Sequence, residues 1–173
     1  APELMIQAGT PYCVMEYHSL GTLRGGLKML GWDALKKSLC GILEGIAVAH
    51  AHGLIHCDLK PSNILRGPRG LVITDFGIAH QLDPTALSPE RAQSSGELSG
   101  TPSYMAPEQI KARHRYYGPW TDLYALGCLT YRLTCGQPPF RSSPVVNRLL
   151  QHLNESPPQL DAQFPVPSGL DTW

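Results

Sequence analysis

The segment that decides the fold is His56-Cys57-Asp58-Leu59-Lys60-Pro61-Ser62-Asn63-Ile64-Leu65. It brings a carboxylate, an ammonium group and a side-chain amide close together along the chain, on Asp58, Lys60 and Asn63. Around it, from Leu54 to Gly77, short apolar pieces alternate with polar clusters that contain Pro and Gly. That pattern predicts short strands joined by loops. Because loops on a rigid scaffold are where proteins usually place their chemistry, this stretch is the first candidate for a functional site.

The same segment resembles the catalytic loop of protein kinases, in which a Lys follows an Asp by two residues and an Asn follows it by five. Phosphoryl transfer requires an oriented acceptor hydroxyl, a neutralised triphosphate and a metal at a fixed distance. The resemblance implies that Asp58 orients the hydroxyl and accepts its proton, and that Lys60 stabilises the transferring phosphate. Asn63 would offer an amide oxygen, a hard ligand suited to Mg²⁺.

A second motif, Asp75-Phe76-Gly77, comes twelve residues after Asn63 and directly after the strand-like run Leu71 to Thr74. It resembles the metal-binding triplet of the same family. By that resemblance Asp75 would bind Mg²⁺, Phe76 would pack against His56, and Gly77 would let the backbone flip. Each motif alone is weak, but the two in this order identify the chain much more specifically.

Three later segments continue the resemblance. Residues 100–108, Gly-Thr-Pro-Ser-Tyr-Met-Ala-Pro-Glu, resemble the end of the activation segment of Ser/Thr kinases, which would span residues 75–108. There Thr101 would bridge Asp58 and Lys60. Asp122 would lie on a buried helix and hold the backbone of the catalytic loop, and Gly136 to Phe140 resembles the segment that comes after that helix in the family. The resemblance is closest to bacterial-type Ser/Thr kinases.

Upstream, Val14-Met15-Glu16-Tyr17 resembles the hinge of a kinase, with Met15 as gatekeeper. The backbone of Glu16 and His18 would bond adenine, and Leu65 would lie beneath the ring. The implied cofactors are ATP and Mg²⁺, and the implied partner is a protein with an acceptor Ser or Thr. Only about a dozen residues precede this hinge, too few for a glycine-rich loop and its Lys. We therefore expect a kinase fragment with little or no activity of its own.

We expect an α+β, protein-kinase-like fold, which is a mainly α-helical large lobe with short β-hairpins and a remnant of small-lobe strands. Residues 1–18 would be that strand remnant and the hinge, 19–153 the large lobe, and 154–173 a Pro-rich tail. The remnant would be two strands, Leu4 to Ala8 and Tyr12 to Tyr17, around a turn.

Apolar spacing predicts a helix from Asp33 to about His50 that stops at Gly53, and another from Val145 to Leu153. The segment Thr121 to Thr134 is apolar on nearly every side, which predicts a buried helix. The Ser-rich stretch Ile78 to Gly100 is typical of a long loop, in which Ser88, Ser94, Ser95 and Ser99 are either phosphorylation sites or simply solvated residues.

Composition narrows the class of protein. The chain has 173 residues, 42% hydrophobic and 16% charged, with 14 basic and 14 acidic side chains, so it is globular and carries no formal net charge. Neither a basic footprint for nucleic acid nor an apolar run long enough for a membrane span is present in the sequence. Five cysteines without a pairing pattern favour reduced thiols and a cytoplasmic location. The oligomeric state stays open.

Three alternatives remain beside the kinase interpretation. The chain could be a non-catalytic kinase-like binding module or scaffold. It could transfer phosphate to a small molecule, although Lys60 and residues 100–108 argue against that. His50, His52 and His56 could suggest zinc, but offsets of two and six residues do not share a helical face.

Three residues depart from the family pattern. Cys57 stands where many kinases have an Arg that binds an activation-loop phosphate, and a thiol cannot make that bidentate contact. Activity should therefore not depend on a phosphate at this position. Ser62 and Arg132 stand where kinases that prefer basic substrates often carry Glu. We therefore expect basic substrates to be recognised poorly.

Overall fold

The computed structural model describes residues 3–7, 10–25, 31–76, 80–81 and 100–170. The strands, in chain order, are β1 (Glu3–Gln7), β2 (Thr10–Val14), β3 (Leu54–Ile55), β4 (Ile64–Gly67), β5 (Gly70–Ile73) and β6 (His80–Gln81). The α-helices are α1 (Trp32–Ala51), α3 (Pro107–Ile110), α4 (Pro119–Cys135) and α5 (Val145–Asn154). Short 3-10 helices are η1 (Leu23–Gly25), η2 (Pro61–Asn63) and η4 (His114–Tyr116).

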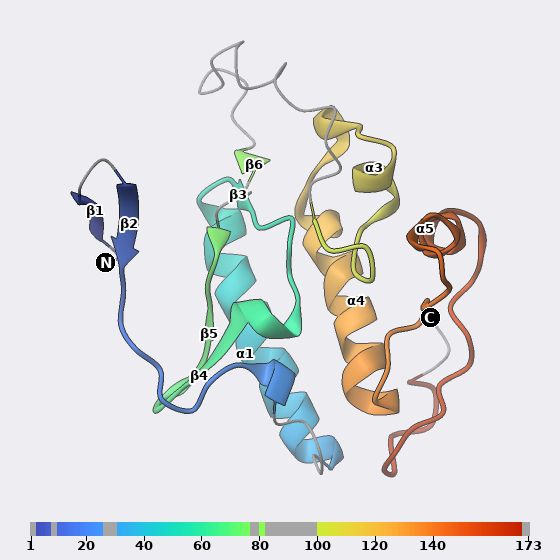
Figure 1. Cartoon of the computed structure of the whole chain (residues 1–173). Helices are drawn as coiled ribbons and strands as arrows, with labels where there is room; N and C mark the ends of the chain where they lie inside the picture. Colours follow the sequence, from blue (N-terminus) through green and yellow to red (C-terminus); the bar gives the residue numbers. More distant parts are fainter. Residues whose placement is uncertain (1–2, 8–9, 26–30, 77–79, 82–99, 171–173) are drawn as a thin grey trace.

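Two long helices, α1 and α4, run side by side through the body of the molecule (Figure 1). The β4–β5 hairpin lies against α1, and α5 lies on the other side of α4 (Figure 1). The β1–β2 hairpin stands apart from this body and is joined to it by the segment after β2 (Figure 1). The arrangement confirms the expected mainly helical α+β fold with short hairpins.

Each sheet in the described residues is a single antiparallel pair: β1 with β2, β4 with β5, and β3 with β6. In the β4–β5 pair Ile64 lies opposite Ile73, and Gly67 lies opposite Gly70 across a tight turn. The register brings the end of β5 back beside the start of β4, so the residues after β5 return to the loop that precedes β4.

The core is built from the facing sides of α1 and α4. On α1 the buried side chains recur at helical spacing, at Leu35, Ile42 and Ile46. They meet Leu129 of α4 and Leu59 of the catalytic loop, and all five are at most 2% exposed. Burying a side chain of this size contributes roughly 1.5–3 kcal/mol. The loop that carries Asp58 is therefore anchored in the core rather than laid over it.

Glycines end both long helices. Gly53 adopts φ +71° and donates its N–H to the carbonyl of His50, as expected for the end of α1. Gly136 adopts φ +78° and donates to Arg132 at 2.8 Å at the end of α4. Within α1, an added Cβ at Gly45 would lie 2.9 Å from the Ile73 side chain, so this glycine allows β5 to pack closely.

Several expectations need correction. The helix over Thr121 to Thr134 starts earlier, at Pro119, and is not buried all round: Trp120 is 59% exposed and Leu123 is 49% exposed. An apolar composition does not reveal which face lies on the core. The second strand begins at Thr10 rather than after the turn and ends at Val14, short of Tyr17. The proposed turn residue Gly9 lies outside the described residues.

The Pro-rich tail after α5 contacts the body of the molecule. The backbone N–H of Gln163 donates to the carbonyl of Thr134 at 2.9 Å, and Phe164 packs against the main core. The expected loop over 78–100 falls almost wholly outside the described residues, as do Gly77 and the four serines proposed as phosphorylation sites. Within the described residues only β6 and Gly100 belong to it. None of the described helices is long and apolar enough to cross a membrane.

Candidate active site

Asp122, near the start of α4, fixes the backbone of the catalytic loop. Its carboxylate accepts the N–H of His56 at 2.9 Å and the N–H of Cys57 at 2.9 Å, one on each oxygen. The oxygen that binds His56 also contacts His50 Nε2, on α1, at 2.7 Å. The Asp122 side chain is buried, so these bonds form in a medium where an unpaired carboxylate would be costly. The expectation that Asp122 holds this loop is confirmed.

Cys57 takes the left-handed conformation, with φ +66°. That geometry costs a non-glycine residue roughly 1–3 kcal/mol and persists only when the surroundings enforce it. Here the bond from its N–H to Asp122, and the bond from Gln109 Nε2 to its carbonyl at 2.7 Å, hold it. The side chain is 5% exposed and packs with Ile55 and Tyr117. At the position where many kinases have a phosphate-binding Arg, this chain therefore has a buried thiol that packs against apolar side chains.

His56 ties the catalytic loop to the strand before the second motif. The N–H of Asp58 donates to His56 Nδ1 at 3.2 Å, so Nδ1 is the acceptor. The proton then sits on Nε2, which donates to the carbonyl of Thr74 at 3.0 Å. The ring also packs on Phe76, with 4.6 Å between centroids, which confirms the predicted contact. His56 thus has a structural role, and it sets Asp58 and Asp75 relative to each other.

Asp58, Lys60 and Thr101 form a closed set of hydrogen bonds. Lys60 Nζ contacts Asp58 Oδ2 at 2.5 Å and Thr101 Oγ1 at 2.8 Å. The Thr101 hydroxyl donates to Asp58 Oδ1 at 2.8 Å. The predicted bridge from Thr101 to both partners is confirmed, across more than forty residues of sequence. It locks the rotamers of a carboxylate and an ammonium group that are both partly buried.

Asn63 and Asp75 have the oxygens that a magnesium ion would use. The Asn63 amide group donates through Nδ2 to the Asp58 carbonyl at 3.0 Å and to Asp58 Oδ2 at 3.2 Å, which leaves Oδ1 with only a long contact from Ser62 at 3.4 Å. The Thr74 N–H donates to the Asn63 carbonyl at 2.9 Å, so Asp75 comes immediately beside it.

Asp75 itself is exposed, has φ +65°, and its carboxylate makes no hydrogen bond or ion pair within the described residues. An available amide oxygen and an available carboxylate fit the ligand preferences of Mg²⁺. No group of three or more His, Cys, Asp or Glu in the described part of the chain could hold a metal ion. A metal here would therefore complete its coordination with water or substrate oxygens.

The four residues predicted for nucleotide binding are less closely assembled. Met15 is 54% exposed, and its sulfur lies 4.0 Å from Thr74 Oγ1. The His18 ring approaches Gly67 at the β4–β5 turn, and Leu65 pairs with Thr22 in an isolated bridge. The segment that follows the hinge, from His18 to Thr22, therefore runs along β4, and no side-chain hydrogen bond joins Met15, Glu16, His18 and Leu65 within the described residues. Within this segment, the Nδ1 atom of His18 is buried and has no hydrogen-bond partner in the described residues.

Residues 103–121 follow Thr101 along the chain and are held by contacts with α4 and α5. Arg148 of α5 donates to Ser103 Oγ at 3.0 Å, and the Thr121 hydroxyl donates to Glu108 at 2.7 Å. Glu108 is thus held by α4 itself. Sequence reasoning missed Gln109, which also accepts the Ala106 N–H, and the role of His50 in binding Asp122. A Gln directly after the Pro107-Glu108 pair is the sequence signal that could have been noticed, whereas His50 offered none beyond its helical face.

The comparisons with known proteins agree with this geometry. The family model for the protein kinase domain matches residues 3–169. The chain is 40% identical over 151 residues to a probable serine/threonine-protein kinase PknB of Bifidobacterium longum, covering 84% of this chain and 21% of that protein. It is 37% identical over 161 residues to serine/threonine-protein kinase PknA of Mycobacterium tuberculosis, covering 90% of this chain and 36% of that protein.

A third relative, probable serine/threonine-protein kinase PknB of Lactococcus lactis, is 36% identical over 165 residues, 92% of this chain and 25% of that protein. The chain thus spans between about a fifth and about a third of the length of these relatives. A match of the family model to nearly the whole chain, together with the assembled Asp58 site, leads to one conclusion: the chain belongs to the protein kinase family, among the bacterial-type serine/threonine kinases.

Proposed function

We propose that this chain forms the acceptor side of a kinase active site that transfers the γ-phosphate of ATP to a Ser or Thr hydroxyl of a protein. The observation that carries the proposal is the closed set of hydrogen bonds among Asp58, Lys60 and Thr101. It rests on a loop backbone that Asp122 holds in place. A scaffold has no chemical need to keep such a set intact.

The bonds around Asp58 leave room for an acceptor hydroxyl. A carboxylate offers about four lone-pair sites. Oδ2 is used by Lys60 and Asn63, whereas Oδ1 accepts only from Thr101 among the described residues. The remaining site on Oδ1 suits the O–H of an incoming Ser or Thr. Asp58 would orient that hydroxyl and take its proton as the new bond to phosphorus forms.

Lys60 has a complementary donor. An ammonium group has three N–H donors, and in this structure one faces Asp58 and one faces Thr101. The third would reach an oxygen of the transferring phosphate. Asn63 and Asp75 would hold Mg²⁺, which together with ATP supplies the phosphoryl group and neutralises its charge. The chain contributes orientation and fixed charge, which is most of the catalysis in this chemistry.

The 173 residues alone should transfer phosphate slowly or not at all. The segment before Met15 is only the β1–β2 hairpin and its flanking residues, and it contains no Lys. Groups that would hold the phosphates opposite Asp58 are therefore not among these residues. A robust rate from the purified chain, abolished by Asp58→Ala, would contradict this.

The proposal is tested by transfer of labelled phosphate from ATP to a Ser/Thr peptide library, with the longest natural polypeptide that contains these residues. Asp58→Asn should lower the rate by about 100-fold or more, because it removes the proton acceptor but keeps the shape. Asp161→Asn, at an exposed carboxylate, is the matched control and should change little. An unchanged rate for Asp58→Asn would overturn the proposal. Absence of Mg²⁺-dependent ATP binding would favour a non-catalytic module.

A further inference from the structure

A cavity of about 310 Å³ opens beside the Asp58 loop. Its lining includes three cationic side chains, Arg24, Lys60 and Arg132, and no carboxylate. They come from separate parts of the fold: Arg24 from η1, Lys60 from the catalytic loop and Arg132 from α4. The whole chain has no formal net charge, so this concentration of positive charge is local. Such a cavity favours anions.

The two arginines keep donors available. Arg132 Nη1 donates to the Tyr104 hydroxyl at 3.1 Å, and its other N–H groups have no partner in the described residues. The Arg24 guanidinium has neither a hydrogen bond nor an ion pair there. By contrast, Lys60 is partly neutralised by Asp58. Guanidinium donors fit carboxylate and phosphate oxygens in bidentate geometry.

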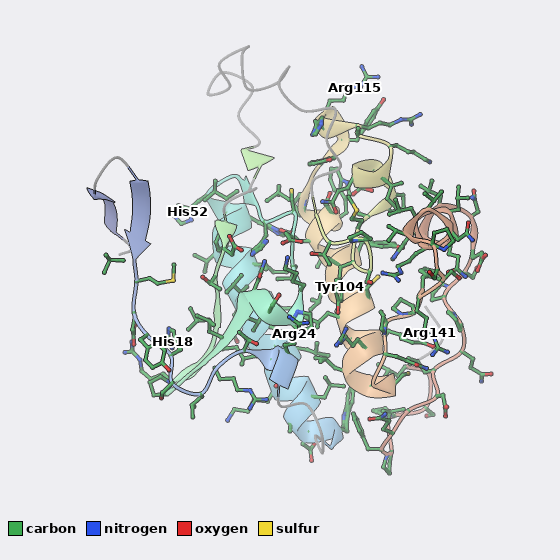
Figure 2. All side chains as sticks on the ribbon, viewed as in Figure 1. His18, Arg24, His52, Tyr104, Arg115 and Arg141 are labelled. Atoms are coloured by element: carbon green, nitrogen blue, oxygen red, sulfur yellow. The ribbon has the colours of Figure 1, made fainter. Side chains whose placement is uncertain are left out.

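The positive charges of Arg24 and Arg132 both act on the hydroxyl of Tyr104. Burial raises the pKa of its phenol, and the positive charges of Arg132 and, more weakly, Arg24 oppose that rise. The hydroxyl lies on the cavity wall together with Thr101 and Ser103. Arg24 and Tyr104 lie close together in the centre of the molecule, far from Arg115 (Figure 2).

The cavity also adjoins the acceptor site. Lys60 and Thr101 line it, and each of them bonds directly to Asp58. Whatever occupies the cavity therefore lies within a few residues of the hydroxyl that Asp58 would orient. A basic side chain would meet like charge there, which disfavours its binding.

We infer that this cavity binds an anionic side chain of the substrate, a carboxylate or a phosphate, a few residues from the acceptor Ser or Thr. The inference rests on the proposed function for its substrate, but the binding it asserts can be measured without catalysis. The occupant is anchored by Arg24 and Arg132, with hydroxyls of the wall as further donors. The pair makes the chain selective for acidic peptides.

The test measures binding of fluorescent Ser-centred peptides to the 173-residue chain by anisotropy. A single Glu, Lys or phosphoserine is placed in turn at each position from four before to four after the acceptor. The best Glu or phosphoserine peptide should bind at least 10-fold more tightly than the Lys peptide of the same position. Arg24→Glu and Arg132→Glu should each remove that preference.

Arg115→Glu is the matched control. It makes the same charge change on an exposed side chain of η4, away from the cavity, and should keep the preference (Figure 2). Equal loss in Arg115→Glu and Arg24→Glu would mean only general charge attraction and would overturn the inference. If the Arg132→Glu variant does not fold, the Arg24→Glu variant still tests the inference, because Arg24 is exposed. A Lys peptide that binds as tightly as the Glu peptide would also overturn it.

Two further readouts separate this inference from the proposed function. If all peptides are phosphorylated equally by the longest natural polypeptide, the kinase function stands and the selectivity fails. If acidic peptides bind through Arg24 but none is phosphorylated, the cavity assignment stands and the kinase function fails. A phosphoserine peptide that binds 10-fold more tightly than its Glu counterpart assigns the cavity to phosphate. Equal binding assigns it to any carboxylate or phosphate.

Discussion

The catalytic loop and the hinge are organised in opposite ways. Two hydrogen bonds to buried Asp122 hold the backbone of the loop, and Leu59 in the middle of the loop is fully buried in the core. The hinge is exposed: Met15 is 54% exposed and Tyr17 is 87% exposed. The Asp58 loop is thus fixed by the chain's own core, whereas the hinge has few contacts that fix it. Substitutions that remove contacts of the loop should therefore lower the free energy of unfolding more than substitutions in the hinge.

The largest effect is expected at Asp122. Asp122→Asn leaves an amide nitrogen facing a backbone N–H or His50, so at least one buried donor loses its acceptor. The free energy of unfolding should fall by about 3 kcal/mol or more. Urea unfolding measures this, with Asp161→Asn as the exposed control that should stay within about 0.5 kcal/mol. Equal loss in both variants would mean that Asp122 is not the anchor.

His152 on α5 gives a pH-dependent effect. Burial, assisted by the charge of Arg148, lowers its pKa from 6.5 to about 4. Its Nδ1 contacts the Tyr124 hydroxyl at 2.8 Å, and its ring packs on Phe140. Between pH 6.5 and 4 the unfolded chain binds a proton that the folded chain excludes. Stability is therefore full above pH 6.5 and falls as the pH drops through this window.

At pH 5 that loss should amount to about 1–2 kcal/mol, after allowance for solvent screening. His152→Gln removes the titrating group, so its unfolding free energy should fall less steeply between pH 6.5 and 4. His52→Gln, at an exposed histidine of the α1 terminus, serves as control and should keep the wild-type slope. Urea titrations at several pH values measure all three chains. Identical slopes for wild type and His152→Gln would refute the assignment.

Thr101 should have a smaller effect on stability. Thr101→Val keeps the shape but removes the hydroxyl that joins Asp58 to Lys60. Unfolding should become easier by about 1 kcal/mol. Thr101→Ser restores the hydroxyl and should recover most of that difference. If Ser and Val variants are equally stable, the hydroxyl does not contribute to the site.

The smallest effect is expected in the hinge. Met15→Ala removes a side chain that is mostly exposed, so the unfolding free energy should change by less than about 0.5 kcal/mol. The same truncation at fully buried Leu59 should cost roughly 2–5 kcal/mol. Thermal unfolding of the two variants compares the regions directly. A Met15→Ala cost equal to that of Leu59→Ala would show that the hinge is packed as firmly as the loop.

The sequence predicted which side chains come together around Asp58, because these residues occur at a fixed spacing. Asp58, Lys60 and Asn63 lie on one loop, and the bridging role of Thr101 came from the resemblance of its motif. The features that the sequence could not predict depend on contacts between distant segments. Arg24 and Arg132 are far apart in the chain, yet they line one cavity only because η1 and α4 pack on the same loop.

The sequence also could not show which side chains of a helix are exposed. The apolar stretch of α4 predicted burial on every side, but Trp120 and Leu123 face outward because only part of the helix surface is covered by the described residues. The contact of the Pro-rich tail after α5 could not be predicted either, since composition does not show the bond from Gln163 to Thr134. The helix ends, by contrast, were predictable, because Gly53 and Gly136 supply the left-handed conformation that ends a helix.

The central claim is that the 173-residue chain preassembles the loop of Asp58 through Asp122, independently of the hinge. Amide hydrogen exchange of the chain without nucleotide tests it most directly. We predict that the N–H groups of His56 and Cys57 exchange at least 100-fold more slowly than those of Glu16 and Tyr17. In Asp122→Asn that protection should be lost first at His56 and Cys57. Equally fast exchange at both places in the wild-type chain would contradict the claim.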